Sequence, residues 1–308
     1  LKATFVPLHD APFTCRLVTG VGTADRLELD LAAPRGASIE EDLRARDFTV
    51  NSIAWDITSP DASFLDPCGG LADLRAHVLR GNSPEVFTDD PLRCLRAYRL
   101  AAELGLRQDP ETMGWVANAA PGLAGVALER VGAEFTRLVT PLGLADRLRA
   151  MDESGVLFQV LPETEGLKGV KQGGYHHLDV WGHTLALLDG LEALVDDPQP
   201  VFRRSADTLG GYSASRQARL RLKLAGLLHD IAKPQCAVVQ DGWTRFFGHE
   251  RVGSEVAFSI CRRLRVPRDV AETVACLVKD HMRPIMLVNG VESPIPTVSA
   301  MRRLVKDC

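Results

Sequence analysis

The chain has 308 residues, of which 45% are hydrophobic and 25% are charged, a composition typical of globular proteins long enough for two or three domains. Its formal net charge of −4 excludes a polycation, so any contact with a nucleic acid must come from a local basic patch. None of the seven cysteines belongs to a CxxC pair, which excludes a disulfide framework and favours a reducing compartment. No apolar run approaches about 20 residues, which excludes a membrane-spanning helix, and the start has no signal-peptide pattern. We therefore expect a cytoplasmic protein.

Residues 1–58 have the pattern of β-strands around one short helix. In residues 27–31 (LELDL) leucines alternate with acidic residues, which is the period of a strand with one apolar face. Ser38 is followed three residues later by Glu41. This spacing is that of a capping box and predicts a short helix over residues 38–46.

From about residue 84 the apolar period becomes helical. We predict one helix over residues 87–106, with Thr88 as its N-cap and Pro91 in its first turn. Gly105 suits the end of that helix.

The rest of the chain is predicted to be helical, with a domain boundary in the Gly-rich stretch 161–177. The polar stretch 197–215 is predicted to be a loop. Further helices are predicted at residues 109–120, 127–139, 142–156, 180–195, 216–232, 249–265, 267–282 and from 297 onward.

Asp30 lies beside Glu28 on the predicted strand. Two carboxylates on a strand could hold a divalent ion, and magnesium prefers carboxylate together with phosphate oxygens. The alternative is that both residues belong to the solvated face of an amphipathic strand.

Arginine recurs at every third position in the predicted helix 87–106, at Arg93, Arg96 and Arg99, and Asp89 and Asp90 precede this basic strip. Guanidinium groups suit a triphosphate or an RNA backbone. They also suit the acceptor edge of a base, while a neighbouring carboxylate can accept from an exocyclic amine. The alternative is an ordinary ion pair between residues four apart on a helix.

Histidines gather in the second half of the chain. His183 lies in a predicted helix, His229 and Asp230 are adjacent at the end of an apolar helix, and His249 and His281 follow on separate segments. Imidazole and carboxylate suit a transition metal of the Mn, Fe, Ni or Zn type, which would lower the pKa of bound water. The alternative is a cluster of structural histidines.

Four segments occur in order and with the spacing of a known family: EDLRARDFTVNSIAWD (41–56), DPCGGLADLRAHVLR (66–80), DDPLRCLRAYRLAAELGL (89–106) and LERVGAEF (128–135). They resemble the bacterial class II tRNA nucleotidyltransferase and poly(A) polymerase family. The resemblance implies addition of nucleotides from CTP and ATP to an RNA 3′ end, with two Mg²⁺ ions. It implies a catalytic role for Asp30, as the third carboxylate of the palm. It implies a nucleotide-binding role for Arg46, Asp47, Asn51, Asp90, Arg93, Arg96 and Arg99, with Asp90 and Arg93 reading the base.

The sequence departs from the family pattern in some places. Ala45 stands where the family has a second arginine, Ser52 where it has alanine, and Asp89 where it has glutamate. The Gly-Gly…Arg-Asp turn and the Asp-x-Asp metal pair of the family are expected upstream of Leu1. Because two-metal displacement needs those carboxylates, we expect the chain as given to lack transferase activity.

A second resemblance covers YHHLDVWGHTLALL (175–188), LLHDIAKP, FFGHE (246–250) and VKDHMRP, and it is to the HD phosphohydrolase superfamily. It implies that a transition metal such as Mn, Ni or Co is held by His183, His229 and Asp230. It implies contacts to phosphate or to a second metal from His249 and His281. Lys233, just after the His-Asp pair, could also help to bind phosphate; the alternative is an ordinary charge at a helix C-terminus. Asp307 is a weak candidate for the family's closing aspartate, which we expect beyond Cys308. The implied activity is hydrolysis of phosphate or 2′,3′-cyclic phosphate esters.

Together the resemblances imply an α+β N-terminal part, a partial nucleotidyltransferase palm sheet, followed by an all-α neck and body and an all-α HD domain. The predicted domains are the palm at 1–80, the neck at 81–160 and the HD domain at 161–308. The favoured function is CCA addition to tRNA or another RNA 3′ end. The alternatives are CC-only, A-only or poly(A) addition, an HD phosphohydrolase with a degenerate palm, and a non-catalytic RNA-binding module. No feature of the sequence indicates an oligomeric state.

Overall fold

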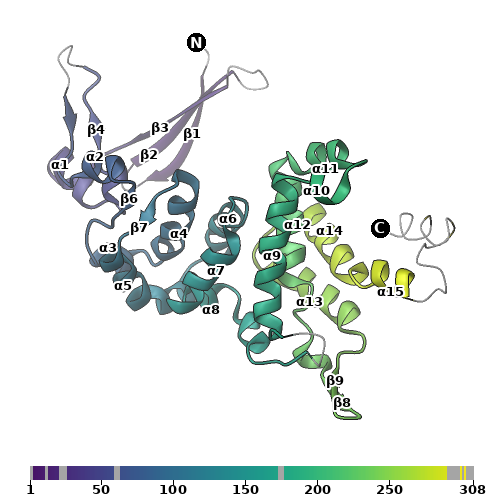
Figure 1. The fold of residues 1–308 in the computed structure, drawn as a ribbon. Coiled ribbons are helices and arrows are strands. Elements are labelled where there is room, and N and C mark those ends of the chain that lie inside the picture. Colours follow the sequence, from purple (N-terminus) through teal and green to yellow (C-terminus); the bar gives the residue numbers. More distant parts are fainter. Residues whose placement is uncertain are drawn as a thin grey trace. The chain divides into compact units, whose positions relative to one another are not determined.

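The computed structural model divides the chain into two compact units, Leu1–Val86 and Phe87–Cys308, which are described separately below (Figure 1). The first unit holds a small antiparallel sheet, and the second is almost entirely helical, which confirms the predicted fold class. The predicted three-domain division at residues 80 and 160 stays a prediction. The structure describes residues 3–10, 13–20, 26–58, 63–172, 177–289, 299 and 302.

The sheet of the first unit contains β1 (Ala3–Asp10), β2 (Phe13–Thr19) and β3 (Leu27–Ala32), in that order and antiparallel. The predicted strand at 27–31 is thus confirmed. The register pairs Leu17 with Leu29 and Arg16 with Asp30, so the leucines of β3 and its acidic residues point to opposite faces. Leu29 is 49% exposed, so no described part of the chain fully covers the apolar face.

The short predicted helix is α1 (Ile39–Arg44). Its N-cap is Ser38, whose hydroxyl accepts from the backbone N–H of Glu41 at 3.2 Å, as predicted. The Glu41 carboxylate in turn accepts from the backbone N–H of Ala37 at 2.7 Å, one residue before the position that a capping box uses. A 3-10 turn (Thr49–Asn51), β4 (Ala54–Trp55), β5 (Phe64–Leu65), α2 (Gly70–Arg75) and β6 (Val78–Leu79) follow.

The predicted single helix 87–106 is wrong, because two helices occupy this stretch. α3 (Glu85–Asp89) ends before Pro91, which is the N-cap of α4 (Leu92–Leu104), and Thr88 lies inside α3. Proline disfavours helical geometry in the residue before it and has no N–H to continue a helix. The predicted end is confirmed, since Gly105 caps α4 with a φ of 65°.

After α4 the helices of the second unit follow the predicted order, with three corrections. The predicted helix 142–156 is divided at Gly155, whose φ is 74°. The predicted loop 197–215 contains two short helices, and a hairpin stands where none was predicted. The elements are β7 (Arg107–Gln108), α5 (Pro110–Ala119), α6 (Leu128–Val139), α7 (Leu144–Glu153), α8 (Val156–Val160), α9 (Val180–Asp196), α10 (Gln199–Phe202), α11 (Ala206–Ser213), α12 (Arg216–Leu228), β8 (Val238–Gln240), β9 (Trp243–Arg245), α13 (His249–Arg263), α14 (Arg268–Asp280) and α15 (Arg283–Asn289).

Both unpredicted features have a physical reason. α11 buries Ala206 and Ser213 at its two ends, which stabilises a helix that its polar composition does not predict. The hairpin turns at Asp241-Gly242, where both residues have positive φ values of 53° and 79°, and this dipeptide is a strong signal for a two-residue hairpin turn. The predicted helix from residue 297 onward falls almost wholly outside the described residues. No described helix is long and apolar enough to cross a membrane.

Candidate metal centre

The ends of four helices bring the predicted histidines together. α12 packs against α9 and α14, and α14 packs against α13 (Figure 1). His183 lies in the first turn of α9, His229 and Asp230 directly follow α12, His249 opens α13, and His281 directly follows α14. These side chains all lie at or near helix termini, so the packing of the four helices determines their positions relative to one another.

The Asp230 carboxylate is the centre of this cluster. Its Oδ2 lies 2.9 Å from Nε2 of His229 and 3.7 Å from Nε2 of His183. Its Oδ1 lies 3.4 Å from Nε2 of His249 and 3.8 Å from Nε2 of His281. The structure therefore contains two possible ligand sets, one on each oxygen, which share Asp230.

Backbone carbonyls fix the tautomer of three of the histidines. Nδ1 of His229, His249 and His281 lies 2.9, 2.7 and 2.6 Å from the carbonyl oxygens of Gly226, Phe246 and Val278, respectively. A carbonyl oxygen only accepts, so each Nδ1 carries the proton, and in the neutral ring the lone pair is on Nε2. This is the usual arrangement behind a metal-bound imidazole.

The electrostatics of the cluster fit a bound cation. Nε2 of His249 faces Nε2 of His281 at 3.3 Å, and in their neutral forms both atoms are acceptors. Burial lowers the pKa of His281, which favours the neutral form. Oδ1 of Asp230 is buried and has no hydrogen-bond partner among the described residues. A cation between these acceptors would satisfy them.

Asp230 is held in its charged form. The residue is only 1% exposed, and this burial alone would raise the pKa of its carboxyl. The charge of Lys233, which donates to the carboxylate, counters burial, and the pKa of the carboxyl lies well below its usual range. A carboxylate that stays charged while buried is suited to a cation.

Lys233 supplies the positive charge nearest to Asp230. Its Nζ donates to Oδ2 of Asp230 at 2.7 Å and to Oε1 of Gln172 at 2.6 Å. The same Nζ lies 5.4 Å from the ring centre of Phe246, within the range of a cation–π contact. Lys233 therefore stands beside the cluster, where a phosphate could contact it.

The cluster opens into a cavity of about 690 Å³. One part of its wall consists of the five clustered residues with Gln172, Lys233 and Glu250. Another part is apolar and consists of Leu187, Phe246, Phe247, Met282, Ile285 and Met286. The sequence did not indicate this apolar wall, because its members come from three separate segments.

The predicted nucleotide-binding residues of the first unit lie close together. Nε and Nη2 of Arg46 donate to Oδ2 of Asp42 at 3.2 and 3.0 Å, and its Nη1 donates to the backbone carbonyl of Asn51 at 3.2 Å. The side-chain amide of Asn51 donates to Oδ1 of Asp47 at 3.0 Å. Asp42, which sequence reasoning missed, thus orients the arginine.

Asp30 of β3 is exposed and forms an ion pair. Arg16 donates to its two carboxylate oxygens at 2.6 and 2.8 Å. The hydrogen bond from Arg16 lowers the pKa of Asp30, which favours the charged form that a metal ligand needs. Its catalytic role stays a prediction.

The basic strip of α4 is divided between surface and interior. Arg99 is 4% exposed and pairs with Glu134 of α6 and Glu103 of α4. Arg93 and Arg96 are half-buried, and Asp90 accepts from Arg130 at 2.7 Å. The sequence spacing predicted that the three arginines lie in one strip of the helix. It could not show that Arg99 is buried, because the partner Glu134 lies on a different helix.

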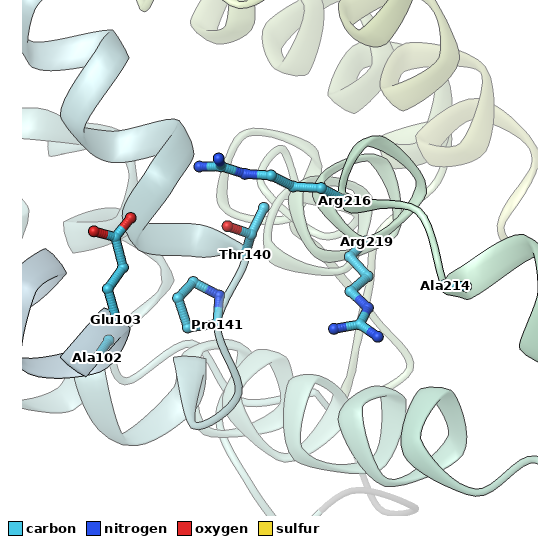
Figure 2. Close-up of a pocket in the computed structure, with 7 residues that line it drawn as sticks. All are labelled: Ala102, Glu103, Thr140, Pro141, Ala214, Arg216 and Arg219. Carbon is cyan, nitrogen blue, oxygen red and sulfur yellow. The ribbon is translucent and has the colours of Figure 1, made fainter. Parts of the chain in front are cut away.

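A second cavity of the same unit, of about 350 Å³, lies between α4, the α6–α7 turn and the start of α12 (Figure 2). Glu103, Thr140, Arg216 and Arg219 line it, and Figure 2 shows Arg216 extending past Thr140. Sequence reasoning did not find it. Among the described residues, its lining shares none with that of the histidine cavity, so the two cavities are distinct.

Comparison with known families identifies two segments of the chain. Residues 18–80 match the model of the poly A polymerase head domain, and residues 180–301 match that of the HD domain. The chain is 36% identical over 267 residues to the A-adding tRNA nucleotidyltransferase of Deinococcus radiodurans, covering 84% of this chain and 56% of the relative. It is 35% identical over 289 residues to the CC-adding tRNA nucleotidyltransferase of Thermus thermophilus, covering 92% and 60%. The chain thus spans between half and two thirds of the length of these relatives.

Solved structures share the fold. A chain described as a tRNA-processing enzyme complex superposes with a TM-score of 0.66 at 21% identity, covering 99% of this chain and 70% of that chain. A tRNA nucleotidyltransferase solved with a primer tRNA and an incoming ATP analogue has a TM-score of 0.60 at 21% identity, covering 95% and 77%. These matches agree: the chain contains a poly A polymerase head domain and an HD domain, and over most of its length it is similar to bacterial tRNA nucleotidyltransferases.

Proposed function

We propose that this protein adds nucleotides to the 3′ end of tRNA, and that it adds C, C and A from CTP and ATP with Mg²⁺. The observation that carries the proposal is the similarity to nucleotidyltransferases over at least 84% of the chain in the two relatives above. These relatives are named A-adding and CC-adding, and a third, from Nitrosomonas europaea, is named a multifunctional CCA protein (33% identity over 83% of this chain). Specificity therefore differs among relatives of similar identity, and an assay must decide it.

In the proposed reaction the residues of this chain bind and orient the nucleotide. Arg46, held by Asp42, would contact the triphosphate through its remaining donor capacity. Asp90, just before α4, and Arg93, the second residue of α4, would read the donor and acceptor groups of the base. Asp30 would contribute a carboxylate to Mg²⁺, which neutralises charge at the phosphates.

The test uses the full-length gene product and tRNA transcripts that end at the discriminator base, at C and at CC. Each transcript is incubated with Mg²⁺ and labelled CTP or ATP. Addition of C, C and then A supports the proposal. Addition of A alone to the CC end, of C alone, or of long A tails moves the assignment to A-adding, CC-adding or polyadenylating enzymes. No incorporation contradicts a transferase function.

We further propose that the histidine cluster is a phosphohydrolase site for phosphate and 2′,3′-cyclic phosphate esters. His183, His229 and Asp230 would hold one Mn, Ni or Co ion, with His249 and His281 binding phosphate or a second ion. The ion would lower the pKa of bound water and polarise the phosphoryl group. Lys233 would neutralise phosphate charge at its Nζ, and the carbonyls behind the imidazoles would keep their lone pairs directed inward.

Hydrolysis of a nucleoside 2′,3′-cyclic phosphate tests this second activity. The protein is first treated with chelator and then given Mn²⁺, Ni²⁺, Co²⁺ or Mg²⁺ separately. Activity that is lost with chelator and restored by a transition metal supports the proposal. Activity that neither chelator nor added metal changes contradicts it. If transfer fails while hydrolysis succeeds, the HD site is the only working centre and the palm is degenerate.

A further inference from the structure

Asn82 lies just after β6, and its side chain is the centre of a hydrogen-bond network. Its Nδ2 lies within hydrogen-bond distance of four acceptors, which belong to a segment 30 to 39 residues earlier in the chain. They are the carbonyls of Leu43, Arg44 and Arg46 at 3.1, 3.4 and 3.0 Å, and the hydroxyl of Ser52 at 2.7 Å. One amide thus joins the end of α1 to the end of the 3-10 turn that follows it.

These acceptors determine which way the Asn82 amide points. A carbonyl oxygen can only accept, so the amide atom that faces the three carbonyls is the nitrogen. Oδ1 of Asn82 is then buried without a hydrogen-bond partner among the described residues, an arrangement that costs free energy. The side chain is therefore placed for its donors, although its own acceptor stays unsatisfied.

Ser52 extends the network to the middle of the segment. It is completely buried, and its hydroxyl donates to the carbonyl of Phe48 at 2.9 Å while it accepts from Asn82. Ser52 is also one of the departures from the family pattern, which has alanine at this position. Because alanine has no hydroxyl, the link between Asn82 and Ser52 belongs to this chain and not to the family pattern.

The backbone around Asn82 pairs with the same segment independently of the side chain. The backbone N–H of Asn82 donates to the carbonyl of Asp47 at 3.2 Å. Phe48 and Gly81 form an antiparallel β-bridge. A substitution of the Asn82 side chain leaves these backbone bonds in place, so the two segments should stay together in a variant.

The segment that Asn82 holds carries three of the proposed nucleotide-binding residues. Nη1 of Arg46 donates to the carbonyl of Asn51 at 3.2 Å, and the Asn51 amide donates to Oδ1 of Asp47 at 3.0 Å. We propose that Asn82, with Ser52, is a positioning residue of the nucleotide site, which holds the backbone that presents Arg46 to the triphosphate. The inference rests on the proposed transferase function and extends its site to two residues beyond those that contact the nucleotide.

Three variants separate the contributions to this network. Asn82→Ala removes the amide. Asn82→Asp keeps the shape but turns an acceptor toward the three carbonyls, so it should have a larger effect than alanine. Ser52→Ala introduces the residue of the family pattern and removes one of the four acceptors. Asn118→Ala is the matched control, since Asn118 is an exposed asparagine on α5, in the other unit.

Binding of CTP and of ATP to the full-length gene product with Mg²⁺, measured by isothermal titration calorimetry, gives the direct readout. We expect Asn82→Ala to weaken binding by roughly 5- to 30-fold, as for the loss of one or two net hydrogen bonds. The factor should be the same for both nucleotides, because the triphosphate is common to them. Ser52→Ala should weaken binding by about 2- to 10-fold, and Asn118→Ala should bind like the parent.

Extension kinetics on tRNA provide a second readout. We expect the KM for each nucleotide to rise in Asn82→Ala by the factor found in calorimetry, while the KM for tRNA stays at the parent value. A rise in the KM for tRNA without a rise for the nucleotides would contradict a role in positioning Arg46.

A double-mutant cycle with Arg46→Ala separates positioning from a general loss of stability. If Asn82 acts through Arg46, Asn82→Ala should change nucleotide affinity little once Arg46 is absent. If the network only stabilises the fold, Asn82→Ala should lower the affinity by the same factor with and without Arg46. That result would overturn the inference, and so would an Asn82→Ala affinity equal to that of the parent.

Urea denaturation of each variant checks that it is folded. Should Asn82→Ala not fold, the cycle is run with Ser52→Ala, and a Ser52→Ala affinity equal to the parent's then overturns the inference. Failure of the proposed function looks different, because the parent itself would bind neither nucleotide and extend no tRNA. A parent that binds and extends, with variants of equal affinity, keeps the transferase function and contradicts only the role of Asn82.

Discussion

A buried ion pair ties together the two helices that carry most of the proposed metal ligands. Lys223 of α12 is 1% exposed, and its Nζ donates to Glu192 of α9 at 2.6 Å and to the carbonyls of Pro141 and Thr140 at 2.8 and 3.2 Å. Glu192 also accepts from the backbone N–H groups of Gly143 and Leu144 at 2.7 and 3.1 Å. The pair therefore joins α9, α12 and the α6–α7 turn.

Replacing one partner should be costly. Lys223→Met fills a similar volume but leaves the Glu192 carboxylate buried without its counter-charge and leaves two carbonyls without their donor. Breaking a buried ion pair on one side costs about 3–5 kcal/mol in free energy of unfolding. Because His183 lies on α9 and Asp230 follows α12, the same change should also weaken metal binding.

Urea denaturation of the parent, Lys223→Met, Glu192→Gln and the double variant measures this effect. We expect each single variant to lose about 3–5 kcal/mol and the double variant to lose less than the sum of the two, because removing both partners leaves no unpaired charge. Arg262→Ala, a change of an exposed cation on α13, is the control and should stay within about 0.5 kcal/mol of the parent. Losses below about 1 kcal/mol, or strictly additive losses, would refute the reasoning.

Three further predictions concern pH, base choice and the α4–α6 network. Burial alone would raise the pKa of Glu192, but Lys223 and the two backbone N–H groups outweigh it and lower that pKa, so this carboxylate stabilises the fold above its unfolded pKa of about 4.3. That stability is lost as pH falls through the lower folded pKa. The difference in unfolding free energy between the parent and Glu192→Gln should therefore shrink on acidification from about pH 5. A difference that stays constant with pH would contradict the assignment. Arg93→Ala should reduce the preference for CTP and ATP over GTP and UTP in competition assays on tRNA while the melting temperature stays near that of the parent; unchanged base choice would exclude Arg93 as a reader of the base. Arg99→Ala should instead lose about 1–3 kcal/mol of unfolding free energy, because it removes a buried cation from Glu134 and Glu103, which keep Arg96 and Arg137 as partners; a loss below about 0.5 kcal/mol would contradict a structural role for Arg99.

The sequence was most informative where function requires particular side chains at helix ends. His183, His229, Asp230, His249 and His281 were all named from their residue types and motifs, and the structure brings all five together. Their carbonyl partners could not be predicted, because a backbone carbonyl leaves no mark in the sequence. The tautomers, on which the fit to a cation depends, are therefore a result of the fold.

Other misses have separate physical causes. The break between α3 and α4 was visible in principle, since Pro91 stands at it, but the apolar period ran through it. The short helix α11 depends on burial of Ala206 and Ser213, which composition does not report. The apolar wall of the cavity could not be predicted either. Hydrophobicity alone does not distinguish a residue that lines a cavity, such as Phe247, from a residue of the core.

The account depends most on the claim that the cluster around Asp230 is a metal centre. Metal content and affinity of the full-length protein and of Asp230→Asn, measured by mass spectrometry of dialysed protein and by titration with Mn²⁺, Ni²⁺ and Co²⁺, test it most directly. We predict that the parent binds a transition metal, and that Asp230→Asn, which removes the charge shared by both ligand sets, loses at least 10- to 100-fold in affinity while its fold is retained by circular dichroism. A parent that binds no such metal, or a variant that binds it equally well, would contradict the claim.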